Sequence, residues 1–291
     1  MKTFYTRFLL AFCVSLAFCG DDEKYSFIHG GFQKLNVGEN WKYRVSHELS
    51  FTIPEIGFIK YSTENIETMK FLGTEGEFGK MEAILTEMES DNYVNGLEIM
   101  DHYREAMENN PCYLYINIDG AIEYINPVKD EDAYLQEAFE AAYMNIYPHA
   151  FRYPFGKNAV DVAEGDSWGE QDTEYDHSKF YVNMGSPPSH ALSKTTFTLK
   201  KVREKKGRKI ATVEMQDSLI LDLYVSVEFW GEKRLITGHA TGTSDAIFKW
   251  DLDSGEMLKS YAVYNFVGDF ELEDKSFHMS IFQRDILKKV K

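Results

Sequence analysis

The sequence predicts a mainly β protein of the β-rich α+β class, in which two repeated curved antiparallel sheets form half-barrels or one extended sheet. Runs of alternating apolar and polar residues, rich in β-branched and aromatic side chains, fill most of the chain from residue 35 onward. Turn signals of the Asp-Gly type separate several of these runs. Short landmarks also recur in the same order, at offsets that grow from 127 to about 135 residues, which indicates an internal repeat.

The N-terminus predicts a secretory signal peptide over residues 1–18. Lys2 and Arg7 form a short basic region, and the apolar run at 8–18 is too short to span ~30 Å of hydrocarbon as a helix. The segment that ends in Cys19 resembles a bacterial lipobox, which implies that Cys19 is acylated and becomes the first residue. Phe18 stands where such signals carry a small residue, so cleavage by the ordinary signal peptidase after Cys19 stays open.

Residues 19–34 are expected to form an acidic tether. Its triplet Asp21, Asp22 and Glu23 resembles the export tag of lipoproteins that reach the cell surface, and it also suits a plain solvated spacer. We therefore expect an exported protein of the cell envelope, an outer-membrane lipoprotein that faces either the periplasm or the cell surface.

Two Gly-acid-polar-Trp groups mark the starts of the two repeats, which we assign to residues 35–129 and 159–291. The groups occupy residues 37–41 and 164–168. Four more pairs follow in the same order. They are charged turns at 73–77 and 203–207, alternating runs at 81–88 and 210–215, Asp-x-Tyr-Val segments at 91–94 and 222–225, and turns at 117–120 and 251–255.

Hairpins are predicted near the end of each repeat. Residues 113–118 and 120–125 flank Asp119-Gly120, and residues 247–251 and 257–261 flank a turn at 253–255. Cys112 enters the first of these strands and is expected to be a buried, inert thiol. Further strands are predicted at 195–202, 219–230 and 260–270.

Residues 130–147 break the β pattern and predict one inserted helix. Asp130 suits the N-cap, acidic residues crowd the first turn, and Pro148 ends the segment. Residues 130–158 would then hold this helix and a linker between the repeats. The apolar stripe that must bury against a sheet is Leu135, Ala138, Phe139, Ala142 and Ile146.

No catalytic, metal-ligating or cofactor-binding residue is predicted. Asp251, Asp253 and Glu256 lack the spacing of an EF-hand loop, so a hairpin turn explains them better, and the same holds for Asn117 and Asp119. None of the eight histidines forms a local zinc pair, and nucleophile-elbow, Walker and dinucleotide-binding motifs are absent from the sequence. Residues that would bind a ligand cannot be named from the sequence.

Trp41 and Trp168 follow the repeated Gly-acid turns at strand starts. Carbohydrate stacking is one interpretation of these side chains, and paired core anchors are the favoured one.

The composition excludes some partners. Hydrophobic residues make up 44% and aromatic residues 15% of the 291 positions, which is typical of a globular protein. The net charge of -16 argues against nucleic acid as a partner. Removing residues 1–18 takes away two of 31 basic residues, so 29 oppose 47 acidic ones and the mature charge is -18. Such a body is expected to be repelled by anionic headgroups, so that the acyl anchor alone holds it at a membrane.

The lipobox-like start, the Gly-acid-x-Trp openings and the Asp-Gly hairpins together resemble a family of bacterial envelope lipoproteins of unknown function. Their architecture is similar to the lipoprotein-carrier half-barrels of the LolA and LppX type. The resemblance implies a concave apolar surface that shelters acyl chains, and it carries over no functional residue. Carriers of this type usually contain more helix than the 130–147 segment supplies.

The sequence therefore suggests a non-enzymatic envelope lipoprotein, held at the membrane through Cys19. On its curved sheet it would bind an apolar or amphipathic, lipid-like ligand or a partner protein of the envelope. The alternatives are a structural or adhesive cell-surface lipoprotein and, less favoured, a glycan-acting hydrolase with dispersed carboxylates.

Overall fold

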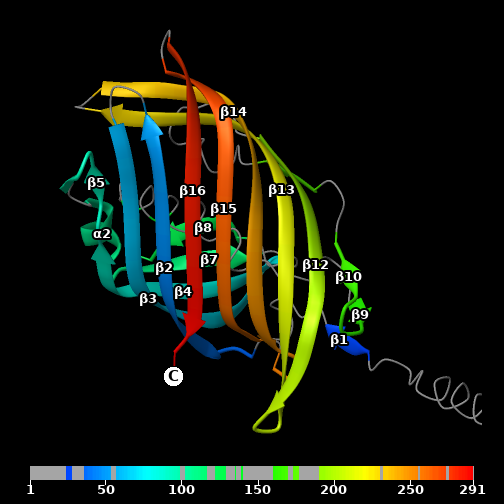
Figure 1. Cartoon of the computed structure of the whole chain (residues 1–291). Helices are drawn as coiled ribbons and strands as arrows, with labels where there is room; N and C mark the ends of the chain where they lie inside the picture. The colour runs from blue at the N-terminus through cyan, green and yellow to red at the C-terminus, as the bar shows by residue number, and fades with distance from the viewer. Residues whose placement is uncertain are drawn as a thin grey trace, which may run out of the picture.

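One antiparallel sheet of 14 strands organises the molecule (Figure 1). The computed structural model describes residues 24–27, 36–53, 57–98, 102–116, 122–128, 135, 139, 160–169, 173–176, 190–229, 232–254, 256–272 and 275–290. Along the main path of the sheet the strands follow the order β10 (Ser167–Trp168), β12 (His190–Lys205), β13 (Arg208–Phe229), β14 (Glu232–Asp251), β15 (Glu256–Leu272), β16 (Lys275–Lys289), β2 (Asn40–Ile53), β3 (Gly57–Glu75), β4 (Phe78–Ser90), β7 (Pro111–Ile116) and β8 (Ile122–Pro127).

The remaining strands are short. β11 (Thr173–Asp176) pairs with β12, and β5 (Tyr93–Val94) pairs with β3 and with β6 (Leu97–Glu98). β1 (Tyr25–Phe27) and β9 (Val160–Val162) form a separate two-stranded sheet, so part of the predicted 19–34 tether is a strand. The prediction of a mainly β protein with one extended sheet is confirmed, and the division into domains stays a prediction.

Alternation along each long strand separates an inner from an outer face. Successive side chains of a strand point to opposite faces, so the buried set of β13 repeats every second residue, as at Ala211, Val213 and Met215. The neighbouring strand β14 continues the set with Ala246 and Phe248, which pair with Met215 and Val213. The inner face therefore runs unbroken from strand to strand.

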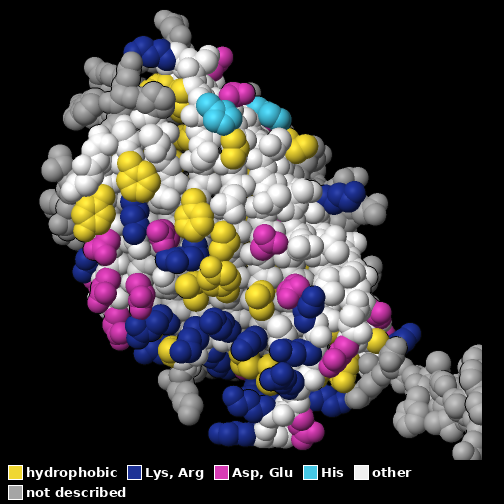
Figure 2. Space-filling view, viewed as in Figure 1, with side chains coloured by type: hydrophobic (Ala, Val, Ile, Leu, Met, Phe, Trp, Pro, Cys, Tyr) yellow, Lys and Arg dark blue, Asp and Glu magenta, His cyan; other side chains and the backbone are white. Residues whose placement is uncertain are grey.

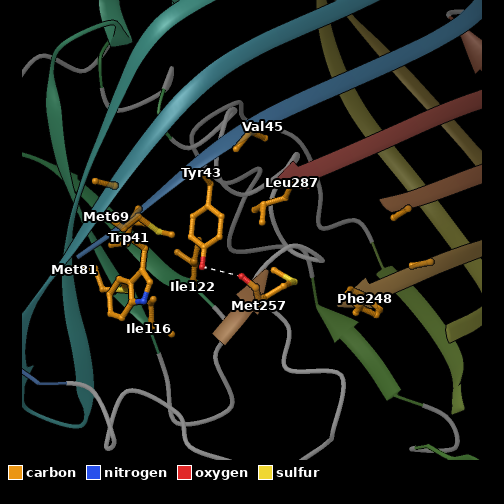
Figure 3. Close-up of a cluster of buried hydrophobic side chains, with 14 of the residues drawn as sticks. Trp41, Tyr43, Val45, Met69, Met81, Ile116, Ile122, Phe248, Met257 and Leu287 are labelled. Atoms are coloured by element: carbon orange, nitrogen blue, oxygen red, sulfur yellow. Dashed lines mark hydrogen bonds between the residues drawn. The ribbon is translucent and has the colours of Figure 1, made fainter. Parts of the chain in front are cut away.

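The sheet curves until β7 and β8 lie behind β15 and β16 (Figure 1). We call the lower end the one that carries the β12–β13 and β14–β15 turns and the C-terminus, and the upper end the one that carries the β13–β14 and β15–β16 turns. At the lower end Trp41, Met81 and Ile116 share one buried cluster with Phe248 and Leu287 (Figure 3). Both halves of the sheet thus pack on the same core.

Little of the described chain is helical. α2 (His102–Met107) was not predicted, because six residues are too few for a helical repeat to register. Leu135 and Phe139, from the predicted 130–147 helix, are helical and buried in the core, and the other stripe positions lie outside the described residues. No helix in these ranges is long and apolar enough to cross a membrane.

The two Gly-acid-x-Trp turns have the same backbone hydrogen bonds. The Gly38 N–H donates to the Phe71 carbonyl at 2.8 Å, and the Gly165 N–H donates to the Leu199 carbonyl at 2.7 Å. Both glycines have positive φ, +90° and +94°. The acidic residue that follows, Glu39 or Asp166, accepts a backbone N–H three residues earlier through its carboxylate. Matching turns are what a duplication would leave, and the duplication itself stays a prediction.

We expect Gly38→Ala and Gly165→Ala to destabilise the fold by similar amounts, about 1–2 kcal/mol each. An added Cβ meets no atom within 4 Å at either glycine, so backbone conformation alone sets the loss. Denaturant unfolding of both variants measures it, with Gly165→Asn as a control that tolerates positive φ better. A large difference between the two alanine variants would show that the turns are not equivalent.

Candidate functional site

The inner face carries two apolar clusters, and Phe266 packs against both of them. The lower cluster is the core just described, and it draws side chains from both halves of the sheet. The upper cluster has a smaller buried centre, and most of its members are only half-buried. We define the upper cluster as Ile53, Ile59, Ala240, Phe270 and Met279, with Phe51, Tyr61, Val94, Phe266, Leu272, Phe277 and Ile281 packed around them.

Glycines on one strand let aromatic rings of the next strand lie flat in the upper cluster. A Cβ added to Gly242 would lie 2.5 Å from the ring of Phe266, and one added to Gly238 would lie 2.3 Å from the ring of Phe270. Each ring therefore covers a glycine on β14, as aromatic residues do when they shield strand glycines. Phe270 also stacks on Phe277, with 6.0 Å between the ring centroids. The result is a broad aromatic surface on the inside of the sheet.

A band of polar side chains crosses the inner face beside the upper cluster. The strand register places them in adjacent rows, so that Asp217 pairs with Ser244 and His47 pairs with Asp285. Most of these side chains are buried or nearly so. The polar band consists of Thr195, Asp217, Ser244, Gln283, Asp285, His47 and Asn65.

Several members of the polar band bind one another. His47 Nδ1 lies 2.5 Å from Asp285 Oδ1, and the Gln283 amide donates to Asp285 Oδ2 at 2.8 Å. The Thr195 hydroxyl donates to Asp217 Oδ1 at 3.2 Å. By contrast, Ser244 Oγ and Asn65 Oδ1 are buried without a hydrogen-bond partner among the described residues. A buried polar oxygen without a partner costs free energy, which makes the Ser244 hydroxyl and the Asn65 amide oxygen candidates for contact with a bound molecule.

This arrangement suits a molecule with a polar part and an apolar part. Ser244 lies two residues after Gly242 on the same face of β14, and Gly242 pairs with Phe266. The Ser244 hydroxyl therefore borders the aromatic surface. A polar group at Ser244 and a hydrocarbon chain along the upper cluster would both meet matching surface.

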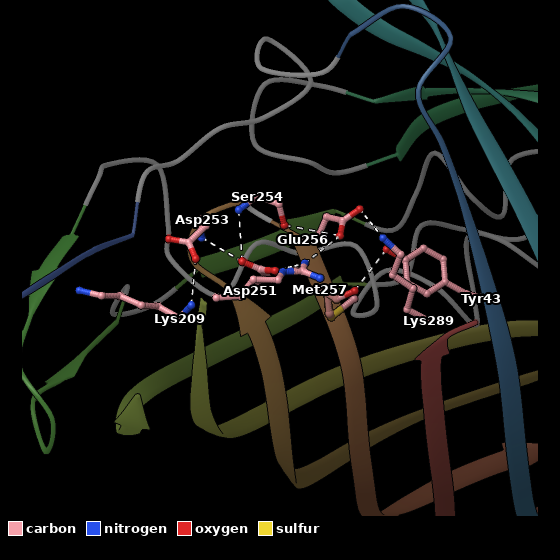
Figure 4. A network of polar contacts seen from close by, with 9 residues as sticks. Tyr43, Lys209, Asp251, Asp253, Ser254, Glu256, Met257 and Lys289 are labelled. Carbon is pink, nitrogen blue, oxygen red and sulfur yellow. Dashed lines mark hydrogen bonds and ion pairs between the residues drawn. The ribbon is translucent and has the colours of Figure 1, made fainter. Parts of the chain in front are cut away.

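The aspartates of the β14–β15 turn accept hydrogen bonds from backbone N–H groups and so hold the turn in its conformation (Figure 4). Asp251 is fully buried, and its Oδ1 accepts the N–H groups of Asp253 and Ser254 at 3.0 and 3.2 Å. Its Oδ2 forms an ion pair with Arg208, and Asp253 accepts the backbone N–H of Lys209 at 2.9 Å. These contacts are those of a hairpin turn. The corresponding turn at 117–121 lies outside the described residues, although β7 and β8 pair on either side of it.

Histidines and aspartates alternate in one row on the outer face, near the upper end. His239 Nδ1 lies 2.7 Å from Asp222 Oδ1, and His278 Nδ1 lies 2.9 Å from Asp269 Oδ1. Each imidazole thus has a carboxylate on the neighbouring strand. Within the described ranges no three His, Cys, Asp or Glu side chains are placed to hold a metal ion.

Tyrosines of β7 and β8 gather around Lys80 on the outer face. The Lys80 ammonium lies 4.3 Å from the Tyr113 ring centroid and 2.7 Å from Glu75, and Tyr115 stacks on Tyr124 at 4.1 Å. The hydrogen bond to Glu75 raises the pKa of Lys80, which favours the charged ammonium still further. These groups are paired with one another, which indicates a structural role.

The other residues singled out from the sequence have structural positions. Cys112 is a thiol with no exposed surface, buried as predicted. Trp41 is buried in the core, and Trp168 packs against the core while stacking on Phe197 at 5.9 Å, so both act as core anchors. Cys19 lies outside the described residues.

No family model and no curated protein matches the chain. Among solved structures it is similar to lipovitellin, studied for its lipid–protein interactions, with 12% identity and a TM-score of 0.48. That alignment covers 88% of this chain and 25% of the other, so the chain spans about a quarter of the lipovitellin chain. It also aligns with a mutant of the Rh. blastica porin at 8% identity and a TM-score of 0.22, covering 87% of this chain and 100% of the porin. Similarities this weak do not bear on the ligand.

We expect Asp251→Ala to destabilise the fold by about 3 kcal/mol, because it removes two backbone hydrogen bonds and an ion pair from a buried carboxylate. Asp253→Ala is the matched control, and it should cost less than about 1 kcal/mol because its side chain is exposed. Thermal unfolding measures both losses. Added calcium or a chelator should leave Tm unchanged, and a rise of Tm with calcium would overturn the assignment of this turn.

Proposed function

We propose that this chain is an exported envelope lipoprotein, anchored through Cys19, whose inner face binds an amphipathic, lipid-like ligand. The observation that carries the proposal is the half-buried aromatic surface of the upper cluster directly beside the polar band. The role is one of binding and sheltering, without a chemical step.

The upper cluster supplies the apolar part of the proposed site. Phe266, Phe277 and Ile281 are half-buried, so apolar surface stays open to a ligand. Covering such surface stabilises a complex by roughly 25 cal/mol for each Å² removed from water. The Phe266 ring over Gly242 is half-buried, so part of it stays open to the side of an extended hydrocarbon chain, whereas the Phe270 ring over Gly238 is fully buried and supports it from within the cluster.

The polar band supplies the polar part. The buried Ser244 hydroxyl would bind a headgroup hydroxyl, ester or phosphate oxygen at the border of the aromatic surface. Asn65 offers a second buried oxygen further across the band. Water at these positions would lie in a confined, largely apolar region, and its displacement by a ligand group with matching hydrogen bonds favours binding.

The carboxylates of the polar band favour binding over hydrolysis. Asp285 is held by His47 and Gln283, and Asp217 by Thr195, so each carboxylate is oriented by its neighbours. A glycan-acting hydrolase would need two carboxyls that face one substrate in an open site.

The ligand test uses paired substitutions on opposite faces of the same two strands. Phe266 pairs with Ile281 on the inner face, and the next pair along, Val267 with Ser280, lies on the outer face. We expect native mass spectrometry of the envelope-purified protein to show a lipid-sized adduct. Phe266→Asn with Ile281→Asn should lose the adduct, whereas Val267→Asn with Ser280→Asn should keep it. An adduct-free unaltered chain, or equal retention by both variants, would count against the proposed ligand.

Ser244→Ala separates binding from stability. Because the hydroxyl has no hydrogen-bond partner within the described chain, we expect its removal to leave Tm unchanged or raise it slightly. Loss of about 1 kcal/mol of hydrogen bonding to the ligand should weaken binding roughly five-fold. Titration of the delipidated protein with the lipid identified by mass spectrometry measures this change. Unchanged affinity would remove Ser244 from the site.

Anchoring is tested by Cys19→Ala. We expect the unaltered protein to stay in the membrane fraction after a high-salt wash, because acyl chains hold it there independently of charge. The variant should move to the soluble fraction under the same wash. Unchanged partition of the variant would refute the anchor.

A further inference from the structure

Basic side chains form an in-register row across the outer face near the lower end. Lys249 pairs with Lys259, Lys259 with Lys288, and Lys288 with Arg44 on four consecutive strands. On the other side of the row Lys201 of β12 and Lys249 of β14 both pair with Thr212 of β13. We call Lys201, Lys249, Lys259, Lys288 and Arg44 the basic row. It crosses six strands, or ~24 Å at the spacing of paired strands.

The side chains of the basic row carry like charges on neighbouring strands and therefore repel one another. All five side chains are exposed, and like charges directly opposite one another destabilise a sheet. Arg44 has a partner in Glu64 at 2.6 Å. The four lysines form no ion pair with any described residue, although Lys200 beside them is paired with Glu214 at 3.0 Å. Unpaired cations in register are a feature that an external anionic surface would neutralise.

More basic and apolar groups extend this surface (Figure 2). Seven of the ten residues at 200–209, which include the β12–β13 turn, are Lys or Arg. Ile247 and Tyr261 pair with each other in the neighbouring row of the outer face, and they are 44% and 38% exposed. The space-filling view shows the Lys and Arg side chains gathered toward the lower end, with apolar side chains among and above them. Cations beside exposed Ile and Tyr are typical of surfaces that meet lipid headgroups.

The N-terminal segment reaches the same end of the sheet. The Tyr25 ring of β1 lies 5.5 Å from the Lys209 ammonium at the β12–β13 turn. Cys19 lies six positions before Tyr25, and an extended chain of that length reaches only ~20 Å. An acyl group on Cys19 would therefore hold the lower end of the sheet close to its membrane.

We infer that the basic row docks the lower outer face on an anionic lipid bilayer. Lys and Arg lie over the headgroups, and Ile247 with Tyr261 contacts the interface. This orientation rests on the proposed anchor at Cys19 and is independent of the proposed ligand. The upper cluster then lies at the end of the sheet away from the membrane. The expected mature charge of -18 is a sum over the whole molecule, and its basic side chains are concentrated on this face, so the repulsion from anionic headgroups that we expected from it does not apply here.

The test uses the full exported chain with Cys19→Ala, so that no acyl group contributes. Co-sedimentation is measured with vesicles of phosphatidylglycerol and phosphatidylcholine in equal parts, and with vesicles of phosphatidylcholine alone. We expect binding to the anionic vesicles only, lost as salt rises. Lys249→Gln, Lys259→Gln and Lys288→Gln together should weaken it about a hundred-fold. Their Tm should be unchanged or higher, because repulsion is relieved.

The control variant also loses three lysine charges, but at positions outside the basic row. Lys60, Lys194 and Lys275, each changed to Gln, should keep binding within a small factor. Equal loss in both triple variants, or equal binding to neutral vesicles, would overturn the proposal. So would binding to heparin or single-stranded DNA without binding to the anionic vesicles, since the surface would then fit a soluble polyanion. Retention of the lipid-sized adduct by the Lys249, Lys259 and Lys288 variant keeps this test separate from that of the ligand.

Discussion

The pairing of β16 with β2 holds the molecule together. Nine consecutive residue pairs, from Ile281 with Phe51 to Lys289 with Tyr43, join the end of the chain to its beginning. We call this pairing of β16 with β2 the seam. Side chains stabilise it on both faces, through His47 with Asp285 on the inner face and Arg284 with Glu48 on the outer face. Without it the strands would form two separate sheets. With it, the inner and outer faces each extend without a break from β12 to β4.

The sequence predicts what local patterning determines. Alternation and turn chemistry predict the strands around Cys112, the hairpin after Asp251 and the burial of Trp41. Helical spacing places Leu135 and Phe139 on one buried stripe. α2 could not be predicted in this way, because six residues are too few to show a helical repeat of apolar side chains. Its end is held by a local contact, in which the Asn110 amide donates to the Ala106 carbonyl at 2.6 Å.

The candidate surfaces could not be predicted, because they depend on the register of strands that are distant in sequence. Lys288 and Arg44 are at opposite ends of the chain and become neighbours only through the seam. The polar band has the same origin, since His47 and Asp285 meet across 238 positions. One signal was present in the sequence. Ser244 and Asp217 interrupt otherwise apolar alternation, and such interruptions mark where an inner face turns polar.

Register therefore assigns two different environments to the same strands. On β14 the even positions carry Gly242, Ser244 and Ala246 inward, while Ile247 and Lys249 face outward. On β15 the same division separates Phe266 and Tyr264 from Tyr261 and Lys259. The proposed ligand-binding surface on the inner face and the proposed docking surface on the outer face need no separate domains, because each strand contributes to both.

The seam also imposes an order in time. During synthesis the chain emerges from its N-terminus, so β2 exists long before β16, the strand that completes its pairing. Until β16 arrives, the backbone N–H and C=O groups along β2 and β15 are open edges, and open edges recruit other chains. Contacts between residues this far apart in sequence also form slowly. Successful folding then depends on β16, and loss of this strand would leave the unpaired edges of β2 and β15 in place of one continuous sheet.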